Sequence, residues 1–91
     1  MQYLICYDIS EQKIRTKVAK YLEHFACRIQ YSIFLCDDKN VKIEKVRMDL
    51  LEMTKQSEKR TLLFVSMCHS CAEKLCLIGE ALEKEEICIV A

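Results

Sequence analysis

The chain has 91 residues, of which 52% are hydrophobic and 31% charged, the composition of an ordinary globular protein. Its length suffices for one small domain over residues 1–91, with a single core of limited size. The 14 lysines and arginines balance the 14 aspartates and glutamates. This balance excludes nucleic-acid binding through overall charge, so any such binding must come from a local basic patch.

The seven cysteines are odd in number and scattered along the chain, and several lie within apolar runs. This pattern favours reduced thiols in the cytoplasm over a disulfide framework. No basic segment precedes the first apolar run, which Asp8 interrupts, so no signal peptide is predicted. No apolar run reaches the length that spans a bilayer. We therefore expect a soluble, cytoplasmic protein without a membrane partner.

The first predicted element is a strand over residues 3–7, a continuous apolar run that indicates burial on both faces. Ser10 is a preferred helix N-cap, and Glu11 adds negative charge to the first helical turn, so a helix is predicted to begin here. Asp8 then lies at a strand-to-helix junction, where folds often present functional side chains on a rigid base. Taken alone, this stretch favours a simpler role for Asp8 as a turn residue.

An amphipathic helix is predicted from Glu11 onward, because apolar side chains recur there at spacings of three and four. Its apolar face consists of Ile14, Val18, Tyr21, Leu22 and Phe25. A basic stripe lies on the neighbouring face and consists of Lys13, Lys17, Lys20 and His24. On an isolated helix such a stripe would be a solvated surface. Because it leads away from Asp8, it is a candidate contact for phosphates.

Residues 28–36 alternate at first between apolar and polar side chains, which predicts one bent strand or two short strands joined near Gln30 and Tyr31. Tyr31, like Tyr7, could stack on a nucleotide, but aromatic side chains in apolar strands more often belong to a core or an interface. A turn follows, and Asn40 is the expected cap of a second helix. The apolar stripe of that helix is Ile43, Val46, Leu50 and Met53.

The remaining segments complete a recognisable order of elements. Residues 61–67 are an apolar strand, residues 68–84 a turn with a short or irregular helix broken at Gly79, and residues 87–90 a last strand. Strand, helix, strand pair, helix, strand is the α+β arrangement called ferredoxin-like, βαββαβ, with both helices on one face of the sheet.

The other face of such a sheet would be apolar and uncovered in a monomer. We therefore expect a homodimer packed sheet against sheet. Residues 86–91 form the extra C-terminal strand, which is predicted to complete the sheet of the partner protomer.

Several stretches of the sequence carry a family resemblance. They are Tyr7-Asp8-Ile9-Ser10 with the following Lys13, Arg15 and Lys17, the run from Arg28 to Phe34 (Arg-Ile-Gln-Tyr-Ser-Ile-Phe), the run from Met67 to Lys74, and the closing run from Ile87 to Val90. Together they resemble the CRISPR-associated Cas-two family, small proteins of the adaptation module that act beside the CRISPR integrase, Cas-one. The resemblance covers essentially the whole chain.

The resemblance implies a homodimer in which the aspartate matching Asp8 lies near the two-fold axis. Two copies of Asp8 would then share a divalent cation, Mg²⁺ or Mn²⁺, for phosphodiester hydrolysis. In this hypothesis Asp8 is both the metal ligand and the catalytic residue. Tyr7 and Ser10 support the loop around it, and Arg15 or Arg28 binds phosphate.

The resemblance also implies a second role, in which the dimer bridges integrase subunits during spacer acquisition and performs no chemistry. Double-stranded DNA would be held by its backbone, without reading of the base sequence. The side chains for this contact are Lys13, Arg15, Lys17, Lys20 and Arg28. RNA is the alternative nucleic acid, and one protein can have both roles.

Cys68 and Cys71 have the spacing of half a zinc site, which Cys76 or Cys88 could complete. The same spacing at a helix start occurs in redox-active dithiols. A structural zinc site usually contains two such pairs, and this sequence has one. Reduced thiols without a metal are therefore the favoured interpretation.

Overall fold

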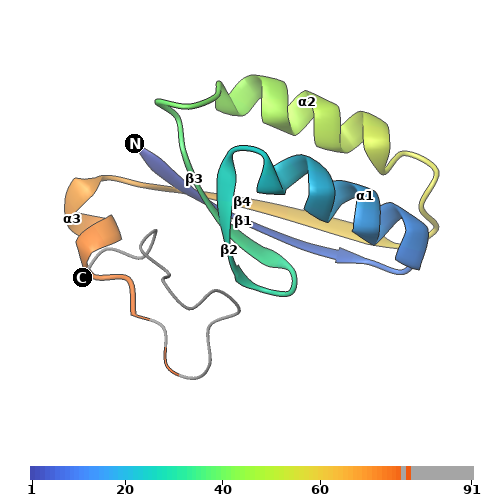
Figure 1. Ribbon diagram of the computed structural model, residues 1–91, viewed down its shortest axis with the longest axis horizontal. Helices are drawn as coiled ribbons and strands as arrows, with labels where there is room; N and C mark the ends of the chain where they lie inside the picture. The colour runs from blue at the N-terminus through green and yellow to red at the C-terminus, as the bar shows by residue number, and fades with distance from the viewer. Residues whose placement is uncertain (77, 79–91) are drawn as a thin grey trace.

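The computed structural model describes residues 1–76 and 78. Its elements in chain order are β1 (Gln2–Ile9), α1 (Gln12–Glu23), β2 (Ala26–Gln30), β3 (Ile33–Asp37), α2 (Ile43–Met53), β4 (Arg60–Met67) and α3 (His69–Glu73) (Figure 1). Within this part of the chain, no helix is both long enough and apolar enough to cross a bilayer. The strand expected over residues 86–91 and the break expected at Gly79 lie outside the described residues.

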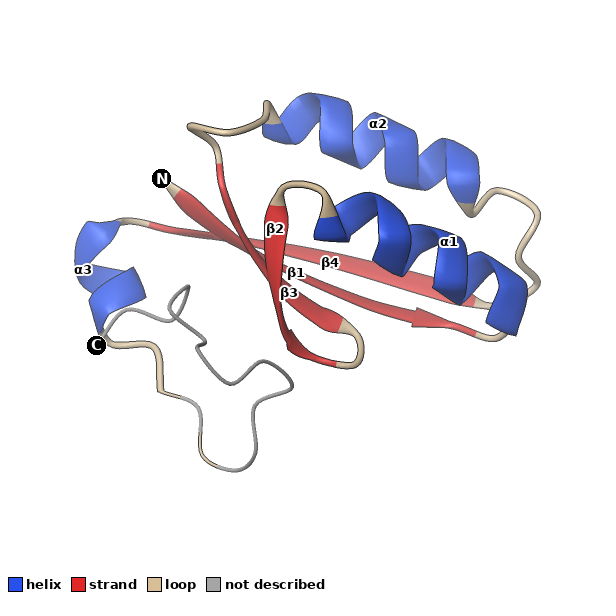
Figure 2. Cartoon of the chain, viewed as in Figure 1, coloured by secondary structure: helices blue, strands red, loops and turns tan. Residues whose placement is uncertain are grey.

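The strands form one sheet in the order β2-β3-β1-β4, and every neighbouring pair is antiparallel. Each long helix connects two parallel strands, β1 to β2 and β3 to β4, that have a third strand between them. Both α1 and α2 lie on the same face of the sheet (Figure 2), as right-handed crossovers require. This arrangement confirms the predicted α+β, ferredoxin-like fold.

The main core lies between the two long helices and the sheet. In β1 the odd-numbered side chains face the helices, and Ile5, Tyr7 and Ile9 are buried there. The helical side chains buried against them include Val18, Leu22, Val46 and Leu50. All four belong to the predicted apolar stripes, which confirms the helix periodicity as a guide to the core.

The opposite side of the sheet has much less cover. We define the open face by Leu4, Cys6 and Asp8 of β1 and by Leu63 and Val65 of β4, which alternate with residues that face the helices. Leu63 remains 52% exposed and Val65 37%. Among the elements that the structure describes, only α3 packs on this side, against the end of β4. Leu4 and Cys6 are half-buried within the described part of the chain, so full burial of the first strand on both faces stays a prediction that needs further cover.

Residues 26–37 form two strands, which confirms the second of the two alternatives for this segment. Strands β2 and β3 pair antiparallel, with a register shift between Arg28 and Gln30 and a turn at Tyr31 and Ser32. The side chain of Tyr31 is 73% exposed on this turn, so it is not part of the core. Tyr7, in contrast, is buried as favoured.

Both helix starts differ from the prediction. The N-cap of α1 is Glu11 rather than Ser10, because the Ser10 backbone N–H donates to Lys59 O and so continues the pairing of β1 with the chain before β4. The N-cap of α2 is Lys42 rather than Asn40, whose backbone N–H donates to Asp37 O and closes the preceding turn. In each case the expected cap residue makes a backbone hydrogen bond outside the helix, and the helix begins one or two residues later.

Candidate nucleic-acid and catalytic site

Asp8 lies near the end of β1, directly opposite Thr61 of β4. Its backbone is therefore held by the sheet, while its side chain is exposed. No other described residue donates a hydrogen bond to its carboxylate or forms an ion pair with it. Asp8 also belongs to the open face, since it alternates with the buried Tyr7 and Ile9. The sheet fixes the backbone of Asp8, and its exposed carboxylate is accessible to a cation.

Glu11 fixes the loop that follows Asp8. Its carboxylate accepts hydrogen bonds from the Ser10 hydroxyl at 2.9 Å, from the Ser57 hydroxyl, and from the backbone N–H of Glu58 at 3.0 Å. These contacts join the β1–α1 loop to the α2–β4 loop. Together they lower the pKa of Glu11 to about 2, with the hydrogen bond from Ser57 as the largest cause.

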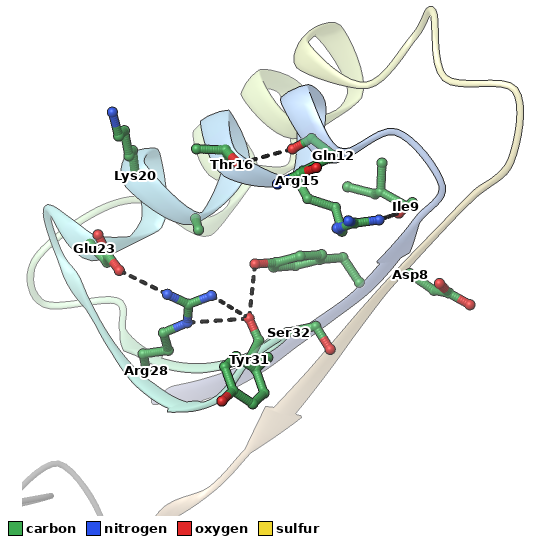
Figure 3. Close-up of a pocket in the computed structure, with 12 residues that line it drawn as sticks. Asp8, Ile9, Gln12, Arg15, Thr16, Lys20, Glu23, Arg28, Tyr31 and Ser32 are labelled. Carbon is green, nitrogen blue, oxygen red and sulfur yellow. Dashed lines mark hydrogen bonds and ion pairs between the residues drawn. The ribbon is translucent and has the colours of Figure 1, made fainter. Parts of the chain in front are cut away.

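A hollow of about 610 Å³ lies between α1 and the β2–β3 turn, and we call it the α1 groove. Asp8 borders one end of it, and Arg28 lies at the other, between Glu23 and the main chain of Tyr31 (Figure 3). Its α1 wall includes Gln12, Arg15, Thr16 and Lys20. The volume falls in the range of about 300–1,000 Å³ that is usual for ligand sites.

The two arginines of the α1 groove are held by the protein itself. Arg15 Nη1 donates to the carbonyl oxygens of Ile9 at 2.9 Å and Ser10 at 3.2 Å. Arg28 Nη1 donates to the Glu23 carboxylate at 3.2 Å, and the Arg28 guanidinium lies 5.5 Å from the centre of the Phe34 ring. Both guanidinium groups are therefore pre-oriented, which reduces the entropy lost when a phosphate binds.

Comparison with known proteins identifies the family of this chain. The family model described as CRISPR associated protein Cas2 matches residues 1–75. The chain belongs to the Cas2 family. This result confirms the resemblance to the Cas-two family that the sequence motifs indicate.

Two relatives match the chain over most of its length. The CRISPR-associated endoribonuclease Cas2 1 of Chloroflexus aurantiacus is 38% identical over 80 residues, which are 88% of this chain and 86% of the relative. The CRISPR-associated endoribonuclease Cas2 1 of Methanospirillum hungatei is 34% identical over 83 residues, which are 89% of this chain and 85% of the relative.

A solved Cas2 structure shares the fold. The crystal structure of Streptococcus pyogenes Cas2 at pH 6.5 has a TM-score of 0.74 at 19% identity, and the match covers 87% of this chain and 100% of that chain.

The sequence-predicted site residues of this Cas2-family chain are only partly brought together. Arg15, Lys20 and Arg28 line the α1 groove, whereas Lys13 and Lys17 are exposed on α1 outside it. Among the described residues, no carboxylate pairs with any of the three lysines of α1. The five predicted basic residues therefore lie in two places, the α1 groove and a separate exposed surface of α1.

The two predicted loop supports act at different places. The Ser10 hydroxyl contacts Glu11 beside Asp8. The Tyr7 hydroxyl donates to Tyr31 O at 3.2 Å, so it holds the β2–β3 turn on the far side of the groove.

Sequence reasoning missed a second basic segment beside Asp8. Lys59 directly precedes β4 and Arg60 begins it. Together with Asp8 and Ser10, they line a smaller hollow of about 440 Å³. The sequence could have indicated this segment. In an antiparallel pair, the first residues of one strand lie beside the last residues of the other, so the start of β4 is expected beside Asp8. Arg60 also donates to Thr54 Oγ1 at 2.9 Å, which fixes it against the end of α2.

The cysteines do not assemble a metal site within the described part of the chain. No group of three or more cysteine, histidine or acidic side chains there is arranged to hold an ion. Cys68 and Cys71 are exposed. Hydrogen bonds, chiefly from the Cys71 backbone, lower the pKa of Cys68, while that of Cys71 is raised by its contact with Cys68. Cys88 lies outside the described residues.

The Glu11 contacts predict a specific pH dependence of stability. Because folding lowers the pKa of Glu11, its ionised carboxylate stabilises the folded state above the unfolded pKa near 4.5. This contribution to the free energy of unfolding is lost as the pH falls towards 2. Glu11→Gln should therefore lower the thermal midpoint at neutral pH, and the difference from the parent should close between about pH 4.5 and pH 2. Glu44→Gln, at an exposed position without a described hydrogen bond, is the control. A difference that stays constant across this pH range would contradict the assignment.

Proposed function

We propose that this chain is the subunit of a metal-dependent endonuclease that hydrolyses phosphodiester bonds in nucleic acid and serves CRISPR adaptation in the cytoplasm. The observation that carries the proposal is Asp8, an exposed carboxylate without a described partner, fixed on a strand beside a basic groove in a member of the Cas2 family. The names of the Chloroflexus and Methanospirillum relatives, both called endoribonucleases, support it.

The position of Asp8 supports a homodimer as the active form. Asp8 shares the open face with exposed apolar side chains such as Leu63 and Val65. A second copy of the chain packed on this face would cover these side chains. It would also bring a second Asp8 to the same interface, and the site is incomplete without that copy.

A divalent cation fits this donor set only when two chains contribute. One chain supplies a single carboxylate, whereas Mg²⁺ or Mn²⁺ is usually held by one or two carboxylates together with waters and substrate phosphate. Shared by two Asp8 side chains, such a cation supplies a Lewis acid for the phosphate and a more acidic bound water. Arg15 and Arg28, pre-oriented in the α1 groove, would bind neighbouring phosphates. The test of this proposal is to measure cleavage of nucleic acid by the Asp8→Asn variant, which should be lost.

A second function is favoured by the basic surface outside the groove. Lys13 and Lys17 are exposed on α1 and have no described carboxylate partner. They suit contacts to the backbone of double-stranded DNA, which need charge and not a cleft. In this role the dimer bridges the integrase, Cas-one, during spacer acquisition and supports the DNA.

Replacing Lys13 and Lys17 together by alanine should weaken duplex binding about equally for unrelated sequences. Each lost phosphate contact reduces the slope of log affinity against log salt by about 0.9, so the slope should flatten by about 2. Titrations at several salt concentrations measure both effects. The control is the Lys39→Ala, Lys42→Ala double variant, which removes the same charge near the start of α2. Equal binding by the parent and the Lys13, Lys17 variant would make this surface a merely solvated one.

A further inference from the structure

Tyr31 combines an exposed ring with an unusually well-held backbone. Its side chain is 73% exposed on the β2–β3 turn. Its carbonyl oxygen nevertheless accepts three hydrogen bonds, from Tyr7 Oη at 3.2 Å, from Arg28 Nε at 3.2 Å and from Arg28 Nη2 at 2.8 Å. These bonds fix the backbone from which the ring projects, and the ring itself remains exposed to a ligand.

The two side chains that hold Tyr31 are themselves anchored. Tyr7 is buried, and its ring stacks on that of Phe34 with the centroids 6.2 Å apart. Arg28 is fixed by Glu23 and lies over the face of the same Phe34 ring. The position of the Tyr31 carbonyl is therefore determined by the core of the domain rather than by the turn alone.

The α1 groove beside this ring has an excess of positive charge. Tyr31 lies at its rim, opposite the wall formed by α1 (Figure 3). The charge of Arg28 is compensated by Glu23. Arg15 donates only to backbone carbonyls, and Lys20 has no described partner, so their charges remain available for an anion.

We propose that Tyr31 is a stacking platform for an unpaired base of a single-stranded nucleic acid, whose backbone phosphates lie along Arg15 and Lys20 in the α1 groove. An exposed aromatic ring on a fixed backbone, beside a basic groove, is a combination that binds single strands. Inside a duplex the faces of the bases are covered by their neighbours, so away from its ends only an unpaired base can stack on the ring. This inference rests on the proposed action on nucleic acid and adds the strandedness of the ligand.

The test measures binding and not cleavage. The Asp8→Asn chain is titrated in a metal chelator against labelled single-stranded RNA, single-stranded DNA of the same sequence, and the corresponding duplex. Stacking of one base contributes about 1–3 kcal/mol, which corresponds to about 5- to 150-fold in affinity. Adding Tyr31→Leu should weaken binding of at least one single strand by about that factor and leave duplex binding unchanged. The Asp8→Asn chain with Tyr31→Phe, a substitution that keeps the ring, should bind like the Asp8→Asn chain with Tyr31 intact.

Any of three binding results would overturn the proposal: unchanged binding of both single strands by Tyr31→Leu, an equal loss for the duplex, or an equal loss for Tyr31→Phe. A change in the mass of the assembly on Tyr31→Leu would also overturn it, since the ring would then belong to an interface between chains. Because the ring is exposed, the thermal midpoint should not change. If Tyr31→Leu specifically loses single-strand binding but the parent protein never cleaves nucleic acid, the proposed nuclease activity is refuted and the proposed stacking site at Tyr31 stands.

Discussion

Replacing Asp8 by asparagine should abolish metal-dependent cleavage while leaving the fold intact. The substitution keeps the size of the side chain but removes the negative charge that binds a hard cation. No described residue depends on the Asp8 carboxylate for a hydrogen bond or an ion pair, so the thermal midpoint should change little. Loss of a group that merely orients a metal ligand costs about 10- to 100-fold, so loss of the ligand itself should cost more than about 100-fold.

The measurement is cleavage of labelled single-stranded RNA and duplex DNA with Mg²⁺ or Mn²⁺ present. Asp38→Asn is a matched control, because Asp38 is also exposed but lies by the N-terminus, whose amino group it contacts at 3.3 Å. Cleavage that survives in Asp8→Asn, or that persists in a chelator, would show that another site or a contaminant is responsible. Spacer acquisition that continues after cleavage is lost would favour the bridging role as the physiological one.

The arrangement of the fold could be predicted because burial imposes periodicity on the sequence. Val18 and Leu22 in the first helix and Val46 and Leu50 in the second are the residues that the structure buries. Together with the order of the elements, these patterns restrict the topology to very few choices. The same reasoning placed Asp8 just after the first strand, whereas β1 continues through Ile9, so Asp8 lies within the last residues of the strand.

The contacts that complete the site join residues distant in sequence, and periodicity carries no information on them. Glu11 and Ser57 are 46 positions apart, and Tyr7 and Tyr31 are 24 positions apart. Such pairs depend on the register of the strands and on the turns between them. The shift in register between Arg28 and Gln30 is likewise not indicated by the alternation of apolar and polar side chains.

The open face provides the second prediction with a large effect. The parent chain of 10.7 kDa should sediment at micromolar concentration with about twice that mass. Leu63→Glu should convert it to a monomer. In one chain this position is already 52% exposed, so a charge there is tolerated. In a dimer packed on this face, each copy would bury an unpaired carboxylate, which costs several kcal/mol.

Met48→Glu is the matched control for Leu63→Glu, because Met48 of α2 is 69% exposed but lies on the opposite side of the sheet. It should keep the mass of the parent. If two Asp8 side chains must meet across the open face, Leu63→Glu should lose cleavage together with dimerisation, although Asp8 itself is intact. A parent protein that sediments as a monomer, or a monomeric Leu63→Glu variant that cleaves at the parental rate, would exclude a metal site shared by two Asp8 side chains. One Asp8 would then have to suffice for any chemistry, with the remaining metal ligands coming from water and the substrate.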